Sequence, residues 1–167
     1  MSWLKGISAV LTVVTVLCVV PSCTKQKQQT PQLLEALLCE FKMEEQCYIY
    51  GRSDPRKKGR DLLLLYGEAY ASYEMAFFED YALALSKKDG GFEIQILLVR
   101  HESQIEEGKR FLRARINVLL QADVERYLGE DFKKYLSSVR IYQRGRYLFL
   151  LATEDNERAI SIIADFF

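Results

Sequence analysis

The chain has 167 residues, of which 49 % are hydrophobic and 12 % aromatic, and this suits one folded domain with a substantial core. Its 23 basic and 23 acidic side chains cancel. That balance argues against nucleic acid as a partner, because nucleic-acid-binding domains usually carry a basic excess.

The N-terminal segment has the layout of an export signal. Lys5 precedes an uncharged, mostly aliphatic run at 6–20, which is shorter than the roughly 20 apolar residues that cross a bilayer. The residues Val20-Pro21-Ser22-Cys23 resemble a bacterial lipobox, with an aliphatic residue three positions before the cysteine and a small one directly before it. A thiolate is nucleophilic enough to accept a diacylglyceryl group, so we expect cleavage before Cys23 and a lipid on its sulfur.

An uncleaved membrane anchor and free secretion are the alternatives to this lipoprotein signal. The competing Cys18 follows the bulky Leu17 inside the apolar run, which makes it a poorer site. We therefore expect a signal peptide at 1–22, a lipidated cysteine and polar tether at 23–30, and one domain at 31–167. The lipid would hold the protein on the extracytoplasmic face of the cell membrane.

The first part of the domain is expected to be helical. Leucines at helical spacing predict a helix over 31–44, with Thr30-Pro31 as N-cap and first turn. Residues 50–60 contain glycine, proline and five basic side chains and indicate an exposed loop, and 61–67 predict a short apolar helix. The stretch 69–80 fits a strand and a helix equally.

Two strands and a long helix follow. Alternating apolar residues predict strands at 79–87 and 92–100, joined by Asp89-Gly90-Gly91 as a tight turn. Ser103-Gln104-Ile105-Glu106 has the pattern of a capping box and predicts the start of a helix that runs to about residue 122.

The C-terminal part predicts a second hairpin and a last helix. The helical pattern continues over residues 123–136, with a break at Gly129. Two strands are predicted at 138–143 and 146–153, and acidic residues after Thr153 cap the last helix. The expected fold class is α+β: a four-stranded antiparallel sheet in β-β-α-β-β-α order, with helices packed on one face and an N-terminal helix before it.

This order on a chain with a lipobox resembles a family of Gram-positive lipoproteins known as domain of unknown function 4358. The resemblance covers residues 33–167. It depends on Tyr66-Gly67, "FEIQILLVR", "RARINVL", Tyr127 and "GRYLFLLATED". It implies the same fold and brings no activity and no catalytic residues.

Candidate catalytic groups are few. His101 is the single histidine, and proton transfer would need a partner group that the sequence does not place beside it. The carboxylate pairs Glu79-Asp80 and Glu106-Glu107 are explained by a strand and by a helix N-terminus. No H-x-x-H, C-x-x-C or E-x-x-H pattern predicts a metal, and we expect no cofactor.

Cys39 and Cys47 would both remain in the exported domain. Their spacing allows a disulfide in an oxidising compartment, and two free buried thiols are the alternative.

Two surface features remain as binding candidates. The basic residues of the predicted loop could bind anionic lipid or wall polymer, and the alternative is that they are simply solvated. They are Arg52, Arg56, Lys57, Lys58 and Arg60. The ten tyrosines would suit a binding surface if several were exposed together.

The favoured hypothesis is a lipid-anchored, non-enzymatic module that binds an unknown protein or cell-wall partner. The alternative is a cell-surface hydrolase or other enzyme with an unrecognised site, for which His101 is a candidate residue. A third hypothesis, an assembly protein, would be marked by an open apolar face of the sheet.

Overall fold

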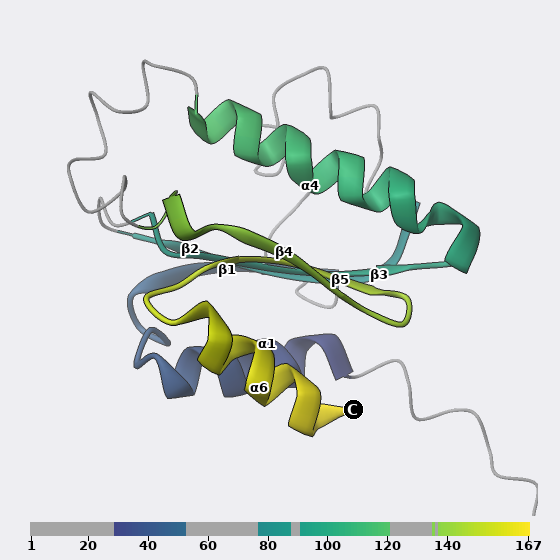
Figure 1. Cartoon of the computed structure of the whole chain (residues 1–167). Coiled ribbons are helices and arrows are strands. Elements are labelled where there is room, and N and C mark those ends of the chain that lie inside the picture. Colours follow the sequence, from purple (N-terminus) through teal and green to yellow (C-terminus); the bar gives the residue numbers. More distant parts are fainter. Residues whose placement is uncertain (1–28, 53–76, 88–90, 121–134, 136) are drawn as a thin grey trace, which may run out of the picture.

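A computed structural model describes residues 29–52, 77–87, 91–120, 135 and 137–167. These residues form an antiparallel sheet of five strands between two layers of helices (Figure 1). The order across the sheet is β1-β2-β3-β5-β4. The elements are α1 (Gln29–Glu40), β1 (Cys47–Gly51), β2 (Phe78–Ser86), β3 (Glu93–Val99), the 3-10 helix η3 (Glu102–Gln104), α4 (Ile105–Leu120), β4 (Arg140–Arg144), β5 (Tyr147–Ala152) and α6 (Asn156–Phe166). The α+β class and the antiparallel sheet are confirmed.

The sheet has one strand more than the four predicted. β1 begins at Cys47 and pairs with β2, from Cys47 opposite Ser86 to Gly51 opposite Ala82. Its five residues are too few to give a clear alternation, and its last two lie in the predicted loop at 50–60. The first helix is also shifted: it begins two residues before the predicted start, and after Glu40 the chain turns at Lys42, whose φ is 54°.

The prediction that the helices pack on one face is wrong. α1 and α6 cover one face and α4 covers the other (Figure 1). The physical reason lies in β3 and β5, which are buried at every position. A strand that is buried on both sides needs cover on both sides. In β3, for example, Ile96 packs with α1 and α6, and Leu97 packs with Phe111 of α4.

The start of α4 also differs from the expected capping box. His101, not Ser103, is the N-cap of η3, and its backbone N–H donates to Gln104 Oε1 over 3.0 Å. One turn later α4 approaches the sheet closely at Gly108, where an added Cβ would lie 2.4 Å from Leu148 Cδ1. Glycine permits this approach because it has no side chain.

The C-terminal hairpin and last helix are where the sequence predicts them. Gly145 makes the turn between β4 and β5 with a φ of 55°. α6 is capped by Asp155, whose carboxylate accepts from Arg158 N–H over 2.9 Å. Within α6 Ile163 is fully buried, whereas Phe167, which follows the helix, is 42 % exposed.

Several predictions lie outside the described residues. They are the signal peptide, Cys23, the helix at 61–67, residues 69–76, most of the turn at 89–91 and the helical stretch at 121–134. Among the helices that the structure describes, none is long and apolar enough to cross a membrane.

A buried ion pair joins α4 to the sheet. Arg115 of α4 donates from Nε and Nη2 to the Glu93 carboxylate of β3 over 3.0 and 2.9 Å, and the two side chains are 9 % and 5 % exposed. The Gln95 amide donates to the same carboxylate. Both charges can be buried because the arginine forms two hydrogen bonds with the carboxylate, and these satisfy its acceptor oxygens.

We expect Arg115→Met to lower the free energy of unfolding by about 3–5 kcal/mol, because it leaves the Glu93 carboxylate buried without its counter-charge. Arg113→Met, on the exposed side of the same helix, should change it by less than about 0.5 kcal/mol. Urea unfolding followed by circular dichroism measures both. Adding Glu93→Leu to Arg115→Met should restore most of the loss, and a double variant as unstable as the single one would contradict the ion-pair explanation.

Candidate functional site

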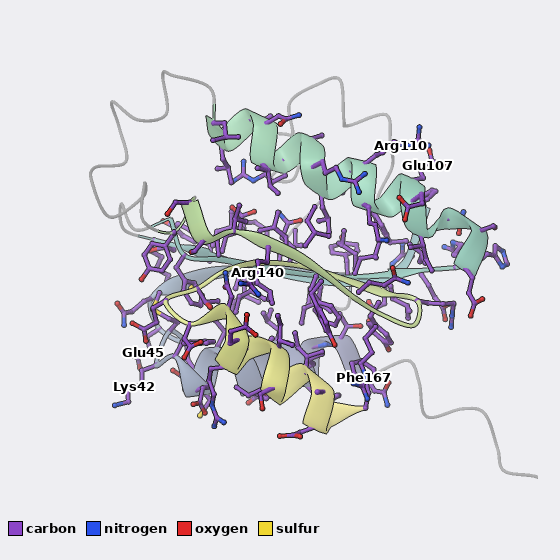
Figure 2. All side chains as sticks on the ribbon, viewed as in Figure 1. Lys42, Glu45, Glu107, Arg110, Arg140 and Phe167 are labelled. Carbon is purple, nitrogen blue, oxygen red and sulfur yellow. The ribbon has the colours of Figure 1, made fainter. Side chains whose placement is uncertain are left out.

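Residues of α1 and of the strands β2, β3, β4 and β5 gather where α1 begins. We call this region the Gln29 end; it comprises Gln29, Thr30, Phe78–Asp80, Val99–His101 and Arg144–Tyr147. The Tyr147 hydroxyl donates to Gln29 Oε1 over 3.2 Å, which places the first turn of α1 beside the start of β5. Figure 2 labels Phe167 at this end and Lys42 and Glu45 at the opposite one.

Arg146 links three strands at the Gln29 end. Its Nη1 donates to the Glu79 carboxylate over 2.7 Å and to the carbonyl oxygens of Val99 and Arg100, each over 2.9 Å. Glu79, the first member of a predicted carboxylate pair, is therefore an ion-pair partner. This contact gives the Glu79 carboxylate a structural role.

Asp80, the second member of that pair, lies on the α1 face. A bulge between Phe78 and Asp80 shifts the register, so that Asp80 stands opposite Leu98, and Leu98 in turn opposite Tyr147. Asp80 is 7 % exposed, and its Oδ2 has no hydrogen-bond partner among the described residues. Burial raises the pKa of Tyr147, and the Asp80 carboxylate raises it further.

Thr30 lies in the first turn of α1 and is not the predicted N-cap. It is fully buried, and its Oγ1 forms no hydrogen bond within the described part of the chain. Its hydroxyl lies near enough to that of Tyr147 to lower the pKa of Tyr147, without the geometry of a normal hydrogen bond. Two buried oxygens, from Thr30 and Asp80, thus lack partners around one tyrosine hydroxyl.

This arrangement suits binding better than covalent catalysis. It offers a carboxylate, two hydroxyls and an amide oxygen, which are acceptors for a hydrogen-bond donor or ligands for a hard cation. The other predicted candidates do not join it in a catalytic set: His101 is exposed at the N-cap of η3, and Glu106 pairs with Lys109 over 2.7 Å.

The sequence alone could not assemble this site. It singled out Glu79 and Asp80 as adjacent carboxylates, but the contributions of Arg146, Tyr147 and Thr30 depend on strand register and on the seating of α1. Gln29 and Tyr147 are 118 positions apart and meet only because α1 packs on the face of the sheet to which Tyr147 of β5 contributes. No local pattern carries that information.

The surface candidates are dispersed. Arg52 follows β1 and donates to the Phe78 carbonyl over 2.8 Å, whereas the rest of the basic loop lies outside the described residues. Among the tyrosines that the structure describes, Tyr48 is the exposed one, at 49 %. No tyrosine surface forms in this part of the chain, and the sheet faces described here are covered by helices on both sides.

An open, polar hollow lies at the far end of the sheet from Gln29. It has a volume of about 330 Å³ and is lined by the start of β4 and the start of α6. Its polar groups bind one another: Asn156 Nδ2 donates to Ser138 O, Thr153 Oγ1 donates to Asn156 Oδ1, and Arg140 pairs with Glu157. Within the described ranges, no three His, Cys, Asp or Glu residues could hold a metal ion together.

Cys39 and Cys47 are free thiols in the structure and do not form the disulfide that their spacing allows. Cys39 is on the exposed side of α1, whereas Cys47 is buried in the core at the start of β1. Burial raises the pKa of Cys47 to about 11, and a hydrogen bond with Glu44 raises the pKa of Cys39.

Comparison with known proteins gives no relative. No family model, no curated protein and no solved structure matches the chain.

We expect Thr30→Val to leave the free energy of unfolding within about 0.5 kcal/mol of wild type, or to raise it, when measured in buffer without metal salts. The exchange is nearly isosteric and removes a buried hydroxyl that has no partner. Thr153→Val is the matched control: its equally buried hydroxyl donates to Asn156, so its loss should cost about 1–3 kcal/mol. Equal losses in both variants would show that the Thr30 hydroxyl has a partner in solution.

Thiol labelling should separate the two cysteines. At pH 8 an alkylating reagent should modify Cys39, and more rapidly as the pH rises toward its elevated pKa. Cys47, buried and with a pKa of about 11, should react only after unfolding. Peptide mapping of the labelled chain, with Cys39→Ser as control, measures this. A disulfide-linked pair of peptides from the unreduced protein would contradict it.

Proposed function

We propose that the protein is a lipoprotein attached through Cys23 to the extracytoplasmic face of the cell membrane, and that its domain is a non-enzymatic binding module. The observation that carries this proposal is the order of the N-terminal features: a basic residue, an apolar run too short to span a bilayer, and the lipobox at 20–23.

The position of α1 supports a short attachment. Gln29, where α1 begins, follows Cys23 by only six positions. Six extended residues span at most about 20 Å, so a lipid on Cys23 would keep the Gln29 end within that distance of the bilayer surface. Two acyl chains on one cysteine suffice for stable attachment, whereas one chain gives reversible binding.

The roles of the charged groups support binding over catalysis. Glu79 and Glu93 are ion-pair partners, Asp155 caps a helix, and His101 begins one. Each has a structural role, and these roles are spread over both ends and both faces of the sheet. The unpartnered oxygens at the Gln29 end are the described groups that most need a ligand.

Replacing Cys23 tests the attachment. We expect Cys23→Ser to prevent lipidation, so that the unprocessed precursor accumulates, because serine cannot accept the diacylglyceryl group as a thioether. Cys18→Ser is the matched control and should leave processing unchanged. Mass spectrometry of the membrane-extracted chain reports both, and an unmodified chain that still begins with Met1 would contradict the lipoprotein assignment.

A further inference from the structure

The first turn of α1 covers a group of oxygens that the described protein atoms do not satisfy. Thr30 is 0 % and Asp80 is 7 % exposed, and neither Thr30 Oγ1 nor Asp80 Oδ2 has a hydrogen-bond partner there. An unsatisfied buried polar group costs about 1–3 kcal/mol and a charged one more. Two such atoms beside one tyrosine call for a partner such as an ordered water or an ion.

The oxygens of this group belong to four side chains. Gln29 supplies an amide oxygen, Thr30 and Tyr147 supply hydroxyls, and Asp80 supplies a carboxylate. Tyr147 donates its proton to Gln29 Oε1, so the lone pairs of its oxygen still point elsewhere. Amide, hydroxyl and carboxylate oxygens are the ligands that hard alkali and alkaline-earth cations prefer.

The local charges favour a single positive charge. Glu79 forms an ion pair with the Arg146 guanidinium, which leaves Asp80 as the buried carboxylate of this group that has an oxygen without a partner. We infer that the oxygens of Gln29, Thr30, Asp80 and Tyr147 form a binding site for a monovalent alkali cation of the size of Na⁺. The positive end of the α1 dipole lies beside this site and opposes every cation there, a divalent one more strongly than a monovalent one, so the attraction has to come from the Asp80 carboxylate.

Such a site escapes recognition from sequence. Three of its four ligands are neutral, and they come from α1 and β5, at opposite ends of the domain. Patterns that predict metals depend on His, Cys and clustered carboxylates, which this site does not use.

The test is the dependence of folding stability on the cation. Urea unfolding of the full-length protein in detergent is measured at constant total chloride, with Na⁺ progressively replacing choline, which is too large to enter. A site in the folded state makes the unfolding equilibrium constant fall as Na⁺ rises, approaching a tenfold fall for each tenfold increase once the site fills.

Four variants locate the effect. Asp80→Asn should abolish the sodium dependence, and Tyr147→Phe and Thr30→Val should weaken it, whatever each does to stability in choline. Glu79→Gln is the matched control, because it neutralises the neighbouring carboxylate outside the site and should keep the full dependence.

Two results would overturn the site. One is an unfolding constant that is the same in sodium and choline, which would leave an ordered water as the partner of these oxygens. The other is a sodium dependence that persists in Asp80→Asn, which would show that the ion acts elsewhere on the protein.

Discussion

The fold depends on the burial of β3 and β5 on both faces. Every residue from Glu93 to Val99 and from Tyr147 to Ala152 is shielded from solvent, so the sheet cannot leave a face open to water. Two separate hydrophobic cores result, one beneath α1 and α6 and one beneath α4. The helices are therefore required on opposite sides, and the ends of the sheet become the places where polar groups can collect.

The two faces meet this requirement differently. On the α4 side, Gly108 lets the helix approach closely at one end, and the Arg115–Glu93 pair fixes it further along. Both features leave polar groups satisfied. On the α1 side, Thr153 and Asn156 are buried and bond to each other, whereas near Gln29 Asp80 and Thr30 each have a buried oxygen without a partner among the described residues. A polar group that is buried without a partner requires an explanation, such as a bound water, an ion or a catalytic role, which is why we place the candidate site on this face.

The sequence predicted those features of the fold that depend on residues close together in the chain. The periodicity of α4, the hairpin turn at Gly145 and the α+β class depend on neighbouring residues, and the structure confirms them. The strand β1 was not predicted because five residues between two turns show little periodicity. The placement of α4 on the opposite face was not predicted for another reason. Apolar residues on both sides of "FEIQILLV" and "RYLFLLA" require a layer of helices on each face, but no local pattern shows which helix covers which face. The site required the bulge before Asp80 and the seating of Thr30, and neither has a sequence signature.

The first turn of α1 has two roles that bear on each other. It is the point where the proposed tether joins the domain, and it supplies two of the four oxygens of the proposed cation site. A bound ion would connect Thr30 of α1 to Asp80 of β2, in addition to the contact between Gln29 and Tyr147 of β5. The turn that receives any pull from the membrane would then be held to two strands. Because local unfolding begins where a chain has few buried contacts, an anchored domain gains most from such a connection at the residue where its tether ends.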